Sequence, residues 1–159
     1  MTWWLPTANE GRRPARALAL ALALAAFGCG PPRAQLESDQ GLLRGLLGAD
    51  GKVSGTLHQA DRAMAIADAD EARRLVLREA KPAADDNVKR AEGAAPATEW
   101  GRARGGELRA LLRERAASLD EYAAAMGSGD AERVLGALER QQAIERRALA
   151  LAKALETLP

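Results

Sequence analysis

Apolar residues recur at spacings of three and four along much of the chain, which is the period of an amphipathic α-helix. The longest stripe consists of Val134, Leu138, Gln141, Ile144, Ala148, Leu151, Leu155 and Leu158, and others consist of Leu108, Leu112, Leu119, Tyr122 and Met126 and of Val53, Leu57, Ala60, Met64 and Ala67. Gln141 is the one polar member of its stripe. It could fix the register of the packed helices or face solvent, and we expect it to face solvent. No long segment alternates with the period of two typical of a strand, so the pattern predicts an all-α protein.

Residues with special backbone preferences mark the expected helix ends in the second half of the chain. Gly127-Ser128-Gly129 should end one helix, because glycine readily adopts the left-handed conformation of a C-cap. Ser128 or Asp130 can cap the helix that follows. Residues 92–98, which contain Gly and Pro, predict a connecting loop, with Thr98 as the N-cap of the next helix.

The first half of the helical region has weaker helix signals. Glycines recur through its first segment, at positions 41, 45, 48 and 51, and each costs about 1 kcal/mol relative to alanine in a helix interior. We therefore expect the first helix to be interrupted or loosened near residues 48–51. Asp68 should cap a second helix, in which Pro82 is expected to introduce a kink because proline lacks the amide hydrogen.

Four helical segments joined by short connections favour an antiparallel four-helix bundle of two helical hairpins over residues 36–159. The two halves also share residue types at an offset of sixty, such as Asp70 with Asp130 and Arg73 with Arg133. In a chain this rich in alanine and arginine, coincidence explains such matches as well as an internal duplication does.

The first thirty residues differ in character from the rest. An uninterrupted apolar run at residues 17–27 follows the cationic residues Arg12, Arg13 and Arg16 and is followed by a small residue, Gly28. This is the organisation of a secretory signal peptide. The run is shorter than the about 20 apolar residues that a membrane-spanning helix needs. The sequence therefore predicts that residues 1–28 are a signal peptide that is removed.

The residues at the end of this run, Ala26-Phe27-Gly28-Cys29, resemble the lipobox of bacterial lipoproteins. The resemblance implies that Cys29 becomes the new N-terminus and carries lipid such as palmitate, with residues 29–35 forming the attachment site and an extended, proline-containing tether. Ala26 and Gly28 also fit the small-x-small rule of an ordinary cleavage site. The alternative is therefore a secreted helical protein with a free thiol at its N-terminus.

Composition narrows the choice of partners. Removal of residues 1–28 takes three Arg and one Glu from the chain, which leaves 20 basic and 21 acidic residues in the mature protein. This balance, with Trp100 and Tyr122 as the only mature aromatic residues, disfavours nucleic acid, which needs a basic patch or a stacking platform.

The single cysteine allows no internal disulfide. The length suits one domain.

The search for chemistry yields no catalytic constellation. His58 is the only histidine, and a metal site on helices would need further ligands at helical spacing. Ser54 lies four residues before His58, but a helical pair alone is weak evidence for a nucleophile. We therefore expect no enzymatic activity, cofactor or metal, and we expect His58 on the surface.

The sequence thus predicts a lipoprotein of the bacterial cell envelope, on the inner or outer membrane, facing the periplasm or exposed at the cell surface. Its partners would be the membrane, through lipid on Cys29, and an unidentified protein, and its role would be structural or partner-binding. A related alternative is a pilotin-like or chaperone-like lipoprotein that holds a partner segment in a groove between helices.

Overall fold

The computed structural model describes residues 30–159, and residues 33–159 form one compact unit. This part of the chain consists of helices with no strand, which confirms the predicted all-α class for the described residues. The helices are α2 (Arg33–Ala65), α3 (Ala69–Leu75), the π-helical turn η1 (Val76–Ala80), α4 (Lys81–Gly93), α5 (Glu99–Ser128) and α6 (Ala131–Ala154). The lipobox residues Ala26, Phe27, Gly28 and Cys29 lie outside the described residues.

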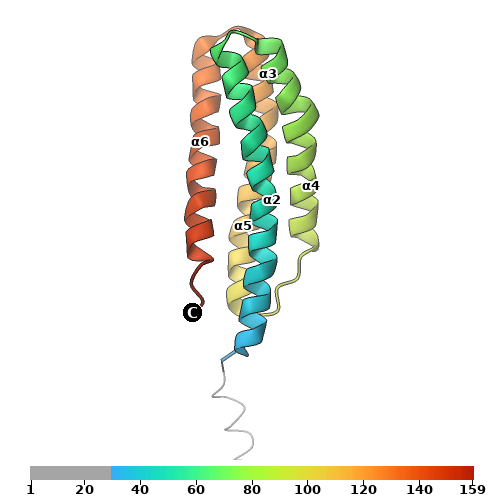
Figure 1. Ribbon diagram of the computed structural model, residues 1–159, viewed down its shortest axis with the longest axis vertical. Coiled ribbons are helices and arrows are strands. Elements are labelled where there is room, and N and C mark those ends of the chain that lie inside the picture. The colour runs from blue at the N-terminus through green and yellow to red at the C-terminus, as the bar shows by residue number, and fades with distance from the viewer. Residues whose placement is uncertain (1–29) are drawn as a thin grey trace, which may run out of the picture. The chain divides into compact units, whose positions relative to one another are not determined.

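The helices lie side by side in a bundle-like arrangement (Figure 1). α3, η1 and α4 follow one another as a single helical segment beside α2 and α5, and α6 packs mainly on α5. The beginning of α2, the loop between α4 and α5 and the end of α6 gather at the same end of the unit.

Buried apolar side chains fill the space between the helices in two clusters. One is centred on Val53, Leu57, Val76, Leu119 and Tyr122, and the other on Leu43, Leu108, Leu112, Ile144 and Leu155. Every member of the stripe predicted from Leu108 to Met126 is buried, so that prediction is confirmed. The stripe of α6 is less deeply placed, because Leu138 and Ala148 are only partly buried.

The predicted interruption of the first helix is wrong: α2 is continuous from Arg33 to Ala65. Its glycines at positions 41, 45, 48 and 51 have open space where a side chain would stand. The opposite side of the helix buries leucine and valine side chains, and each buried side chain of this size contributes about 1.5–3 kcal/mol, more than one glycine costs. Tertiary packing therefore outweighs the weak local propensity.

Both ends of α2 also differ from the sequence prediction. Residues 33–35, expected in the tether, are helical, and Arg33 Nε donates to Glu37 Oε1 at 2.9 Å one turn later. Ala67, expected in the core stripe, is exposed and has a φ of 61°. The left-handed backbone at Ala67 turns the chain before α3, so the apolar stripe ends earlier than its spacing suggests.

The predicted capping residues are confirmed where the structure describes them. Asp68 accepts a hydrogen bond from Glu71 N at 3.0 Å, and Thr98 Oγ1 accepts one from Gly101 N at 2.9 Å. α5 ends before Gly129, whose φ is 69°, and Asp130 rather than Ser128 caps α6 by accepting from Glu132 N and Arg133 N. Local side-chain chemistry therefore sets these three helix starts.

Pro82 does not end its helix. In a regular α-helix its ring would meet the carbonyl of residue 78, four positions earlier. That residue lies in η1, where the amide of Lys81 donates to the carbonyl of Val76 in the wider π-helical pattern. The single π-turn provides the space that proline needs, and the segment continues as α4.

Asp39 fastens the beginning of α2 to the loop before α5. Its carboxylate accepts hydrogen bonds from Ala97 N at 2.9 Å, from Thr98 N at 2.8 Å and from Thr98 Oγ1 at 2.6 Å. Burial acts to raise the pKa of Asp39, but these hydrogen bonds outweigh it and hold the pKa below 3.8. We call Asp39, Ala97 and Thr98 the Asp39 clasp.

Candidate functional site

An ion pair lies in the interior between α2 and α5. Arg115 Nη2 donates to Asp50 Oδ2 at 3.1 Å, and the side chains of Asp50 and Arg115 are only 2% and 1% exposed. Among residues 30–159, Asp50 Oδ1 and Arg115 Nε find no hydrogen-bond partner. A buried polar atom without a hydrogen-bond partner lowers the stability of the fold by about 1–3 kcal/mol. The two atoms therefore need an explanation.

Burial raises the pKa of Asp50 above its usual 3.8. The neighbouring charge and hydrogen bond of Arg115 oppose this rise, and the charge of Glu145 adds to it. The carboxylate is therefore less stabilised than its contact with an arginine alone would suggest.

Further polar side chains extend this ion pair toward α6. Gln141 Nε2 donates to Ser118 Oγ at 2.7 Å, and Ser118 Oγ donates to the carbonyl of Arg115 at 2.8 Å. Gln141 is 5% exposed, and its Oε1 has no hydrogen-bond partner within the part of the chain that the structure describes. The expectation that Gln141 faces solvent is wrong, because its amide completes a polar contact with α5. We call Asp50, Arg115, Ser118 and Gln141 the buried polar layer.

Tyr122 makes a second polar contact between helices. It lies on α5, at least one helical turn beyond the residues of the buried polar layer. Its hydroxyl donates to Asp61 Oδ1 between α5 and α2. Burial, followed by the hydrogen bond and the negative charge of Asp61, raises the pKa of Tyr122 above 10. The phenol therefore remains protonated over the whole physiological range.

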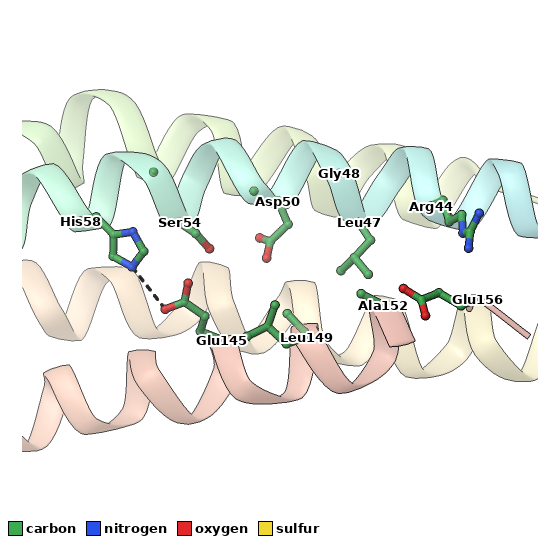
Figure 2. Close-up of a pocket in the computed structure, with 13 residues that line it drawn as sticks. Arg44, Leu47, Gly48, Asp50, Ser54, His58, Glu145, Leu149, Ala152 and Glu156 are labelled. Atoms are coloured by element: carbon green, nitrogen blue, oxygen red, sulfur yellow. Dashed lines mark ion pairs between the residues drawn. The ribbon is translucent and has the colours of Figure 1, made fainter. Parts of the chain in front are cut away.

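A groove runs between α2 and α6 with a volume of about 600 Å³. Figure 2 shows Asp50 pointing from α2 into the space between these helices, with Leu47, Leu149 and Ala152 further along it. His58 and Glu145 face each other at one end, 3.4 Å apart between Nε2 and Oε2, while Arg44 and Glu156 lie at the other. We call this the α2–α6 groove; it is lined by Arg44, Leu47, Gly48, Asp50, Gly51, Ser54, Gly55, His58, Glu145, Ala148, Leu149, Ala152 and Glu156.

A smaller hollow of about 210 Å³ lies next to the groove. It shares Ser54, His58 and Glu145 with the groove, and Arg115 and Gln141 also line it. The buried polar layer therefore borders the groove through Asp50 and the hollow through Arg115 and Gln141. We call it the inner hollow.

The structure places the sequence candidates as follows. His58 is exposed, as expected, at the rim of the α2–α6 groove beside Ser54. Sequence reasoning missed Asp50 and Arg115. A signal for them was present, since Asp50 continues the apolar spacing between Leu46 and Val53, just as Arg115 does between Leu112 and Leu119.

Neither a cluster of metal ligands nor a membrane-spanning helix is present among residues 30–159. No three His, Cys, Asp or Glu side chains in this range gather closely enough to hold a metal ion. No helix in the same range is long and apolar enough to cross a membrane.

No protein-family model, curated protein or solved structure matches the chain. The class that fold and site define is an all-α, bundle-like protein with a buried polar layer beside a groove.

Proposed function

We propose that the chain is a bacterial lipoprotein, cleaved before Cys29 and anchored by lipid on that cysteine. Residues 36–159 would form an antiparallel four-helix bundle that holds a segment of a partner protein in the α2–α6 groove. The proposed role is binding rather than catalysis, in the cell envelope, and without nucleic acid. The signal-peptide pattern of residues 1–28 supports the location, and the groove supports the binding role.

The shape of the α2–α6 groove is the observation that carries the binding proposal. On α2 it is lined by Gly48, Gly51 and Gly55, where a side chain would meet no atom within 4 Å. Ala148 and Ala152 face them from α6. Small residues at spacings of three and four allow the backbone of another helix to approach closely.

The size and edges of the groove also fit a helical segment. From Arg44 to His58 it follows α2 for about 21 Å, at about 1.5 Å per residue, which is roughly four helical turns. Leu149, at the edge, is 66% exposed. An amphipathic helix laid in the groove would cover this leucine and place its apolar face against the glycines and alanines.

Site-specific photo-cross-linking in cells tests the groove. A photoreactive amino acid at position 149 should give a cross-linked product with a partner protein, whereas the same residue at position 135 should not. Leu135 is the matched control because it is another exposed leucine of α6, 60% exposed, and does not line the groove. Gly51→Leu should abolish the product by filling the groove. Equal cross-linking from both positions, or none from 149, would contradict the proposal.

The anchor is tested by Cys29→Ser. The variant should move from the membrane fraction to the soluble or uncleaved fraction, because two or more acyl chains give stable anchoring at about 0.8 kcal/mol per buried methylene. The unchanged protein should take up labelled fatty acid at Cys29. A wild-type protein that is exported, soluble and unlabelled would favour the secreted alternative instead.

A further inference from the structure

We propose that a second copy of this chain packs antiparallel against the outer face of α6. The proposal goes beyond the partner helix in the α2–α6 groove and does not depend on it, because this face shares only Leu149 with the groove lining. Two rows of exposed side chains form the face, and the members of each row lie seven residues apart. The charged row consists of Glu132, Glu139, Arg146 and Lys153, and the leucine row consists of Leu135, Gln142 and Leu149.

The outer face lies on the side of α6 that turns away from the core. Ile144 and Leu151 mark the inner side of the helix, where they are buried, and α6 lies at one side of the unit (Figure 1). Residues seven apart are nearly two turns apart on the same side of a helix, so each row stays together along α6. Leu135 and Leu149 are 60% and 66% exposed. Covering both leucines would remove apolar surface from water, which favours association.

The order of the charges selects a second copy of the chain, running in the opposite direction. Along α6 the charged row has two acidic residues followed by two basic ones. An identical antiparallel helix would place Glu132 opposite Lys153 and Glu139 opposite Arg146 in a single register, because both pairs are symmetric about the same point of α6. The two-fold symmetry forms each pair twice. A parallel copy in register would instead place acid beside acid and base beside base, which is unfavourable.

The charged row has no ionic partners inside the unit. Among residues 30–159, none of its members forms an ion pair. A neighbouring row of α6 differs, because Arg140 pairs with Glu121 and Arg147 pairs with Glu114, both on α5. α6 therefore uses one row of charges to hold α5, and its charged row on the outer face can pair with a second copy.

The leucine row fits the same antiparallel register. Leu135 would face Leu149 of the second copy, and Gln142 would face its own counterpart near the two-fold axis. A glutamine amide both donates and accepts hydrogen bonds, so two copies of Gln142 can pair with each other. From Glu132 to Lys153 the face is about 32 Å long, at about 1.5 Å per residue. Charge and apolar contact therefore favour one and the same arrangement.

The test uses two differently tagged copies of the full chain, purified separately in detergent and mixed at low salt. One copy should retain the other during affinity purification. Glu139→Arg in both copies, or Arg146→Glu in both copies, should reduce retention roughly tenfold, because two attractive pairs become repulsive. A Glu139→Arg copy mixed with an Arg146→Glu copy should recover it, since opposite charges face each other again. The matched control is Asp86→Arg, a reversal at an exposed position of α4, which should change nothing.

Retention that is absent in the wild type, or that the mixed variants fail to recover, would overturn the proposal. The same holds if all variants, including Asp86→Arg, retain the second copy equally, because chains that merely share a micelle would behave in this way. A photoreactive residue at position 135 should also join two copies of the chain, through a peptide that contains Leu149. This product has twice the mass of the chain, which distinguishes it from a product with another protein in the α2–α6 groove.

Discussion

Arg115→Met should lower the free energy of unfolding by about 3–5 kcal/mol, because it leaves the buried carboxylate of Asp50 without its cation. Small domains have a total stability of about 5–15 kcal/mol, so the loss should be visible as a large drop in the urea midpoint followed by circular dichroism. The deficit should shrink at acidic pH. Burial already raises the pKa of Asp50, so the carboxyl of the variant is protonated, and no longer a buried charge, as the pH falls toward that pKa.

A double variant distinguishes loss of the ion pair from general damage to the core. Asp50→Leu combined with Arg115→Met should recover most of the stability, because replacing both partners of a buried pair by apolar groups is often neutral or stabilising. The interpretation would be wrong if the single variant lost less than about 1 kcal/mol, or if the double variant were as unstable as the single one.

Gly101→Ala should lower the free energy of unfolding by about 2–4 kcal/mol. A Cβ atom at this position would lie 2.2 Å from Asp39 Oδ2 and 2.6 Å from Asp39 Cγ, far inside contact distance. The carboxylate would have to move, and it could not keep its hydrogen bonds to Ala97 and Thr98. Thermal unfolding measured by circular dichroism at neutral pH reports the loss.

Gly41→Ala is the matched control for this substitution. Gly41 lies in the interior of α2, and a Cβ there would meet nothing within 4 Å. The same change should therefore raise stability by about 0.5–1 kcal/mol through helix propensity alone. If both alanine substitutions changed stability in the same direction, the close approach of Gly101 to Asp39 would not be the cause.

The all-α class and several helix boundaries were predictable because they depend on neighbouring residues. The stripe from Leu108 to Met126 repeats over many turns, so its period is unambiguous. Thr98, Gly129 and Asp130 act within a few residues of their own position. Such signals need no knowledge of what packs against the helix.

The errors arose where tertiary contacts override local preference. Gly48 and Gly51 weaken α2 locally, but the buried face of the helix keeps it continuous. Gln141 interrupts an apolar stripe, and its burial depends on Ser118, a residue of another helix.

The buried polar layer was not predictable from local patterns. Asp50 and Arg115 are 65 positions apart, and nothing in either neighbourhood identifies the other residue. The available signal was that each charged residue occupies a position where its stripe calls for an apolar one. A charge in such a position needs an oppositely charged partner across the core, but the sequence alone leaves many candidates for that partner.

The Asp39 clasp affects how the helices would respond to a pulling force if the chain were attached at its N-terminus. Asp39 binds the loop before α5, and the neighbouring Gln40 donates to the carbonyl of Leu155 at 2.6 Å, just beyond the end of α6. A pull applied to the chain at Arg33 is therefore shared among α2, α5 and α6. Force from an anchored N-terminus would load several helices at once, so α2 could not peel away by itself from its first turn.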